Sequence, residues 1–149
     1  VEKVYDCFVI RRAELYLNKA EAEAMLDKAE AKQTIKTLLN NRFEGGIPDV
    51  DGLNEKDLIS FIRDERRREL CFEAHRWFDL RRYAVSSKYP EKKSIRHETY
   101  DKNGVLEGDY VLKPYGEDPA WVLPIPGYEI VYNQGNLVDN PQRVERKLE

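Results

Sequence analysis

Several residue types and patterns are scarce in this sequence, and each scarcity excludes a class of protein. There are two cysteines in 149 residues and no Cys-x-x-Cys pair, so a disulfide scaffold is excluded. The longest apolar runs have four residues, whereas a helix needs about 20 to span a bilayer. The net charge of −3 argues against a general nucleic-acid binder, whose domain is usually strongly basic.

The sequence also lacks a targeting signal. It starts with Val1 and has neither the basic nor the apolar segment of a signal peptide, so we expect any leader to be absent from this chain. The length predicts one domain with a sizeable core. Charged residues make up 36% of the chain, which favours long helices with solvated faces that belong to a larger protein.

Helical periodicity dominates the first half of the sequence. Segments 5–28, 29–42 and 54–83 contain no glycine or proline, and their apolar residues recur at steps of three and four, which predicts helices. The short joint near residue 28 predicts that the first two helices form an antiparallel pair. Asn54 is expected to cap the third helix, which should bend or break along its length. The residues expected to face inward in the first two helices are Cys7, Ile10, Ala13, Leu17, Ala20, Ala24, Ala31, Ile35, Leu38 and Leu39.

The second half predicts a hairpin and then a proline-rich coil. Asn-Gly at 103–104 between two extended segments indicates a β-hairpin over 94–112. A two-residue turn would pair Tyr110 with His97 and Tyr100 with Glu107, which puts the two tyrosines on opposite faces unless the register slips or Gly108 forms a bulge. Five prolines follow residue 113 and predict an ordered coil with short helical turns. We expect this coil to be pinned in place by its apolar residues, which are Trp121, Val122, Leu123, Ile125, Tyr128, Ile130 and Val131.

Residues 65–82 form the least usual stretch. Arg66, Glu69, Glu73 and Arg76 recur at helical spacing, so each carboxylate could pair with an arginine three positions away. We expect a partly desolvated ion network beside buried Phe72 and Phe78. If the guanidinium groups are buried, replacing Glu73 by Ala would cost about 3–5 kcal/mol.

Catalytic and metal-binding interpretations of this stretch are weaker. Glu69 and Glu73 have a spacing that suits a glycoside hydrolase, but adjacent arginines lower a carboxylate pKa where an acid catalyst needs a raised one. His75 and His97 have no second ligand at zinc spacing, so no metal or cofactor is expected. Cys71 is expected to be a small buried residue, and the mixed charges around it argue against a phosphate site.

Three motifs resemble those of the SusD/RagB family. The run E-R-R-R-E-L-C-F-E-A-H-R-W-F-D-L-R-R at 65–82 is similar to the C-terminal signature of that family. W-V-L-P-I-P-G-Y-E-I-V-Y-N-Q-G-N-L-V-D-N-P at 121–141 resembles its second signature, and I-R-R-A-E-L-Y-L-N-K-A-E-A at 10–22 resembles a family helix. Cys71 stands where the motif usually has a small apolar residue and Ala74 where it usually has glycine.

The resemblance implies a fold that is mostly α, with tetratricopeptide-like helix pairs, a small β-hairpin insertion and a proline-rich C-terminal coil. It implies one SusD/RagB-like C-terminal domain over 1–149, with a helical core at about 5–84, a variable hairpin at about 88–119 and the proline-rich segment at 120–149. The signature residues that it identifies as architectural are Glu65, Arg66, Glu69, Glu73, Arg76, Trp77 and Asp79.

The resemblance also implies a function. Family members are surface lipoproteins of the Bacteroidetes outer membrane that bind oligosaccharides or other nutrients and pass them to a SusC-like TonB-dependent transporter. They are not enzymes, and their lipid anchor is absent from this chain. Two other readings stay open, a helical-repeat scaffold for a protein partner and a glycoside hydrolase. Flat aromatic side chains suit sugar binding, so the candidate ligand contacts are Tyr100, Tyr110 and Tyr115.

Overall fold

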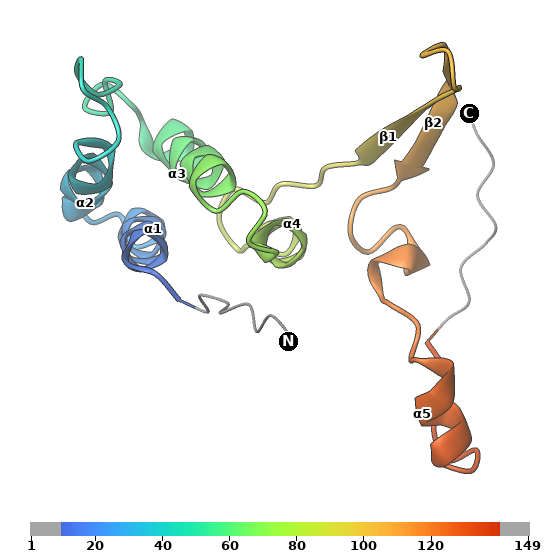
Figure 1. The fold of residues 1–149 in the computed structure, drawn as a ribbon. Helices are drawn as coiled ribbons and strands as arrows, with labels where there is room; N and C mark the ends of the chain where they lie inside the picture. The colour runs from blue at the N-terminus through green and yellow to red at the C-terminus, as the bar shows by residue number, and fades with distance from the viewer. Residues whose placement is uncertain (1–9, 141–149) are drawn as a thin grey trace, which may run out of the picture. The chain divides into compact units, whose positions relative to one another are not determined.

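The computed structural model describes residues 10–140 and divides into two units (Figure 1). Unit 1 contains residues 10–79 and 87–89, and unit 2 contains residues 80–86 and 90–140. The described chain is mostly helical, with one small antiparallel sheet, which confirms the predicted fold class. Among residues 10–140, no helix is both long enough and apolar enough to cross a membrane.

Unit 1 is built on three helices, α1 (Arg12–Met25), α2 (Glu30–Leu39) and α3 (Glu55–Glu69). Helix α1 packs against both α2 and α3, because its apolar residues follow the predicted stripe. Ile10 is the exception at 66% exposed, and Cys7 lies outside the described residues. The predicted inward residues that are buried in this core are Ala13, Leu17, Ala20, Ala24, Ala31, Ile35, Leu38 and Leu39.

The loop between α2 and α3 is held by lysines of α2. Lys32 donates from Nζ to the carbonyl oxygens of Asp51 (2.6 Å) and Leu53 (2.9 Å). Val50 within the loop is fully buried. Asn54 caps α3 as predicted, because its side-chain oxygen accepts the Asp57 backbone N–H at 3.0 Å. These contacts of the loop therefore fix the position at which α3 begins.

The expected break in the long third helix occurs at residues 70–74. Helix α3 ends at Glu69 and α4 (His75–Ala84) begins after a turn in which Phe72 and Ala74 have φ of +64° and +62°. Positive φ is uncommon for residues with a Cβ atom, and the turn takes Phe72 out to solvent. The expectation of buried Phe72, Phe78 and Cys71 is therefore wrong, since all three are exposed.

In unit 2, strands β1 (Ile95–Tyr100) and β2 (Leu106–Leu112) form the predicted hairpin. Its turn differs from the prediction. The Asp101 N–H donates to the Val105 carbonyl at 2.9 Å, so the loop has three residues and ends at Gly104 with φ +79°. The Asp101 carboxylate accepts two backbone N–H groups of the turn, which stabilises this longer loop.

A β-bulge follows from the longer loop. Thr99 pairs with Gly108 and Tyr100 pairs with Leu106, so Glu107 is the extra residue and the predicted pairing of Tyr100 with Glu107 is wrong. The predicted pairing of His97 with Tyr110 is confirmed. The bulge lies on β2, which leaves the alternation of side chains along β1 unchanged.

The proline-rich segment contains a short 3-10 helix, η1 (Pro119–Trp121), and a six-residue helix, α5 (Gly127–Tyr132). Trp121 is 1% exposed, and its indole N–H donates to the Lys113 carbonyl at 2.6 Å. Of the residues expected to pin this segment, Trp121 alone is buried, and Ile125 and Ile130 are half-buried. The other residues predicted to pin the segment are exposed, namely Val122, Leu123, Tyr128 and Val131.

The Asn54 cap gives a direct test of the start of α3. Replacing Asn54 by Ala removes the acceptor for the Asp57 N–H, so we expect the free energy of unfolding to fall by about 1 kcal/mol. Asn54→Ser keeps an acceptor at the N-cap without placing a second carboxylate beside Asp57, so it should stay within about 0.5 kcal/mol of the parent. Urea unfolding followed by far-ultraviolet circular dichroism measures both, and equal losses in the two variants would contradict the cap.

Candidate functional site

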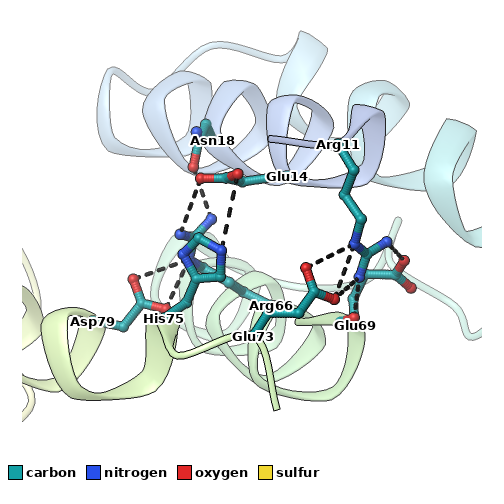
Figure 2. A network of polar contacts seen from close by, with 8 residues as sticks. All are labelled: Arg11, Glu14, Asn18, Arg66, Glu69, Glu73, His75 and Asp79. Atoms are coloured by element: carbon teal, nitrogen blue, oxygen red, sulfur yellow. Dashed lines mark hydrogen bonds and ion pairs between the residues drawn. The ribbon is translucent and has the colours of Figure 1, made fainter. Parts of the chain in front are cut away.

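The signature residues of α3 and α4 meet α1 in a polar network (Figure 2). Its inner part is centred on Arg66 of α3. The Arg66 Nε donates to both carboxylate oxygens of Asp79 on α4 at 2.9 and 2.8 Å, and Nη1 donates to Asn18 Oδ1 on α1 at 2.8 Å. The side chains of Arg66 and Asp79 are each 7% exposed, so this is a buried ion pair that joins three helices.

The edge of the inner part is formed by Glu14 and His75. Glu14 Oε1 lies 3.9 Å from Arg66 Nη2, and its Oε2 lies 4.0 Å from His75 Nε2. His75 is half-buried at the start of α4. Glu14 therefore ties α1 to both α3 and α4.

The outer part of the network is centred on Arg11, which precedes α1. Its Nε donates to the two carboxylate oxygens of Glu73 at 3.0 and 2.9 Å, and its Nη1 donates to Glu69 Oε1 at 2.5 Å. Arg42, which follows α2, donates to both oxygens of Glu69 at 2.8 and 2.7 Å. Glu69 thus joins the residues that flank α1 and α2 to the end of α3.

These arginines keep both glutamates ionised. Hydrogen bonds from Arg42 and Arg11 lower the pKa of Glu69 to about 2, although its burial acts in the opposite direction. The hydrogen bond from Arg11 lowers the pKa of Glu73 as well. A general acid needs a raised pKa to hold its proton near neutral pH, so neither carboxylate is suited to that task.

The partners in this network differ from those expected within the helix. Glu69 and Glu73 are paired with Arg11 and Arg42, which are distant in sequence, because the break at 70–74 ends the continuous stripe. The side chain of Arg11, the guanidinium partner of Glu73, is 31% exposed, so the buried guanidinium group on which the predicted cost of 3–5 kcal/mol depended is not present. Arg76 is half-buried, and it forms no ion pair with any residue of the part of the chain that the structure describes.

Sequence reasoning missed three residues of unit 1 that matter to its architecture. Arg11 and Arg42 lie at the ends of apolar stripes, and the signal for Arg11 was the Arg-Arg pair at 11–12 in the motif that resembles a family helix. Arg63 is 3% exposed and its Nε lies 3.3 Å from Glu21 Oε1 on α1. Its Nη1 donates to the Tyr89 carbonyl at 2.8 Å, a contact that no spacing rule predicts.

The candidate ligand tyrosines lie in unit 2 and are not brought together as one platform. Tyr100 is 54% exposed and its hydroxyl donates to the Glu98 carboxylate on the same strand. Tyr110 is 38% exposed and pairs with His97. Because Glu98 and His97 are neighbours on β1, Tyr100 and Tyr110 face opposite sides of the hairpin.

Tyr115 has a different environment. It is half-buried, and its ring lies nearly perpendicular to the Trp121 ring, with centroids 5.9 Å apart and an interplanar angle of 88°. The Arg81 guanidinium carbon lies 5.3 Å from the centre of the Tyr115 ring, within the range of a cation–π contact.

Trp77 of the signature is also half-buried. Within residues 10–140, no cluster of three or more potential ligands has metal-site geometry.

The lowered pKa of Glu69 predicts a pH dependence. The carboxylate is stabilised in the folded state, since its pKa falls from 4.5 to about 2, so its contribution is complete above pH 4.5 and is lost as the pH falls toward 2. Glu69→Gln should therefore cost about 2–3 kcal/mol at pH 7, and this deficit should shrink in acid. Urea unfolding at pH 7, 4 and 2.5 measures it.

Glu44→Gln is the matched control, because Glu44 is an exposed acid in the loop after α2. It should change the free energy of unfolding by less than about 0.5 kcal/mol at each pH. A Glu69→Gln deficit that stays constant from pH 7 to pH 2.5 would contradict the assignment of a stabilised carboxylate.

Comparison with curated proteins gives two relatives from Formosa agariphila. The chain is 28% identical to SusD-like protein P2 over 142 residues, which covers 89% of this chain and 25% of the relative. It is 41% identical to SusD-like protein P38 over 79 residues, covering 48% of this chain and 16% of the relative. The chain thus spans a quarter or less of the length of these relatives.

Two solved structures that resemble this chain are also SusD-like proteins. A SusD-like protein from Bacteroides fragilis matches with a TM-score of 0.55 and 27% identity over 91% of this chain and 25% of that chain. A SusD-like carbohydrate binding protein from Bacteroides vulgatus matches with a TM-score of 0.56 and 25% identity, over 89% and 30% of the two chains. The model of the SusD family matches residues 3–142, which include the network around Arg66 and Glu69, and the chain therefore belongs to the SusD family.

Proposed function

We propose that the protein binds glycans or related nutrients without catalysis and takes part in their uptake. The observation that carries this proposal is the family match over residues 3–142, together with the likeness to a carbohydrate binding protein from Bacteroides vulgatus. The helices of unit 1 supply a scaffold, and unit 2 supplies a hairpin whose side chains are half-buried or exposed.

The electrostatics of the glutamates support a non-catalytic role. A glycoside hydrolase needs one carboxylic acid that stays protonated until it donates to the leaving group. Glu69 and Glu73 both have lowered pKa values and are held by guanidinium groups. Their hydrogen-bonding capacity is used to join helices, which fits an architectural task.

The place of action and the partner are proposals for the whole protein. Family membership supports a surface lipoprotein of the outer membrane that passes its ligand to a SusC-like TonB-dependent transporter. It also supports one C-terminal domain over residues 1–149. No nucleic acid is expected as a partner, since the chain carries a net charge of −3.

Tyr100, Tyr110 and Tyr115 stay as proposed ligand contacts in unit 2. Tyr100 and Tyr110 lie on opposite faces of the hairpin, so each would contact a ligand singly. Trp121 and Arg81 both pack against the Tyr115 ring, so its orientation is fixed before a ligand arrives. Such preorganisation reduces the entropy lost on binding, which favours Tyr115 of the three.

An oligosaccharide array tests the proposed function. We expect the chain to bind at least one oligosaccharide and to leave it intact, as measured by calorimetry and by chromatography after prolonged incubation. Tyr115→Ala should weaken that binding by about threefold to tenfold, with Tyr100→Ala and Tyr110→Ala measured beside it. If each of the three variants binds with the affinity of the parent, these tyrosines are excluded as contacts.

Two other results would contradict the proposed function itself. One is the absence of any array signal from the folded chain. The other is release of shorter sugars that stops in Glu69→Gln or Glu73→Gln, which would establish the hydrolase reading.

A further inference from the structure

A cavity of about 590 Å³ lies in unit 1. It lies where the turn between α1 and α2 meets the start of α3 and Tyr89, and all of its lining residues belong to unit 1. Pockets that hold small ligands usually measure about 300–1,000 Å³. The cavity therefore has room for one or two sugar rings.

Tyr89 lines this cavity in a strained and supported conformation. Its φ is +50°, a left-handed value that is rare for a bulky residue and that persists only where neighbouring groups impose it. Arg63 holds the Tyr89 backbone in this conformation. It donates to the Tyr89 carbonyl at 2.8 Å and is itself 3% exposed. Arg63 is fixed in turn by Glu21 of α1, which is 5% exposed.

The buried ion pair therefore acts as a support beneath the cavity wall. An arginine can be buried at low cost when its charge is paired and its remaining N–H groups have acceptors. Here one of those acceptors is the backbone of Tyr89. The position of the aromatic ring is thus coupled to the core of unit 1, which is the rigidity that a binding site needs.

The groups around the ring can recognise hydroxyl groups. Glu55, whose carboxylate accepts the Tyr89 hydroxyl at 3.3 Å, and Asp27 supply acceptors at the rim. Lys28 and Lys56 are exposed lining residues that supply donors. The lining contains two acids, Asp27 and Glu55, and three lysines, Lys28, Lys32 and Lys56, so the charges nearly balance, which disfavours a strongly charged ligand.

We propose that this cavity is a glycan subsite in which Tyr89 provides an aromatic surface for a neutral sugar ring. This inference rests on the proposed function and adds a site that includes no residue of strands β1 and β2. The apolar face of a sugar ring would lie against Tyr89, as apolar surfaces do on aromatic rings, and its hydroxyl groups would bind Glu55, Asp27 and Lys28. Lys88 is paired with Asp27, and its Nζ lies 5.8 Å from the centre of the Tyr89 ring.

The test uses three variants of the chain and the neutral oligosaccharide that gives the strongest array signal. Tyr89→Gly removes the ring and leaves a residue that adopts positive φ without strain, so a loss of binding cannot be attributed to backbone distortion. We expect its dissociation constant to rise about tenfold or more. Tyr89→Phe keeps the ring and loses only the hydrogen bond to Glu55, so we expect a rise of about twofold to threefold.

Tyr132→Gly is the matched control, because Tyr132 is 81% exposed on α5 and does not line the cavity; its affinity should equal that of the parent. Amide chemical shifts of the parent should move at residues 27–29, 53–56 and 89 during the titration. If the parent binds and Tyr89→Gly binds equally well, the subsite is wrong and the proposed function stands. If no oligosaccharide binds the folded parent, the proposed function fails and the subsite fails with it.

Discussion

The arrangement of unit 1 depends on the burial of two arginines of α3 against acidic and amide groups of α1. Arg63 is paired with Glu21, and Arg66 reaches Asn18 and Glu14. A buried guanidinium group that loses its partner is strongly destabilising, so few relative positions of the two helices are permitted. As the residue numbers rise on α3 they fall on α1, which fixes an antiparallel register between these helices. Asp79 then adds the start of α4 to the same charge.

The glutamates of the family signature extend this arrangement to the surface. Arg11 and Arg42 converge on Glu69 from the residues that flank α1 and α2, so the end of α3 is fixed to both. Low pKa values follow from this pairing, and they suit structural ions better than acid catalysts. The same buried frame holds the Tyr89 backbone through Arg63, so an architectural network also determines the wall of a cavity.

Much of the helical part could be predicted from the sequence, because apolar spacing and capping act locally. The core positions of α1 and α2 and the Asn54 cap follow from such patterns. The partners of Glu69 could not be predicted, since a break that puts Phe72 and Ala74 at positive φ is decided by tertiary packing. The carboxylate of Asp101 made the hairpin loop one residue longer than an Asn-Gly pair suggests.

The candidate sites were less predictable than the fold. Exposure of Tyr100 and Tyr110 and their placement on opposite faces agree with the sequence pattern, but the predicted partner of Tyr100 was wrong because a bulge at Glu107 shifts the register. No pattern in the sequence indicates a cavity beside Tyr89, because the position of this residue depends on Arg63 and Glu21, which lie 26 and 68 residues earlier. Contacts over such separations are created by the fold, and residue spacing carries no information about them.

The central claim, that the charge of Arg66 is accommodated by Asp79 and joins α3 to α4, is tested most directly by a double-mutant cycle. Arg66→Met and Asp79→Leu should each lower the free energy of unfolding by about 3–5 kcal/mol, because each leaves a buried charge without its partner. The double variant leaves neither charge, so it should lose at least about 2 kcal/mol less than the sum of the single losses. Losses that add to within about 0.5 kcal/mol would contradict the claim.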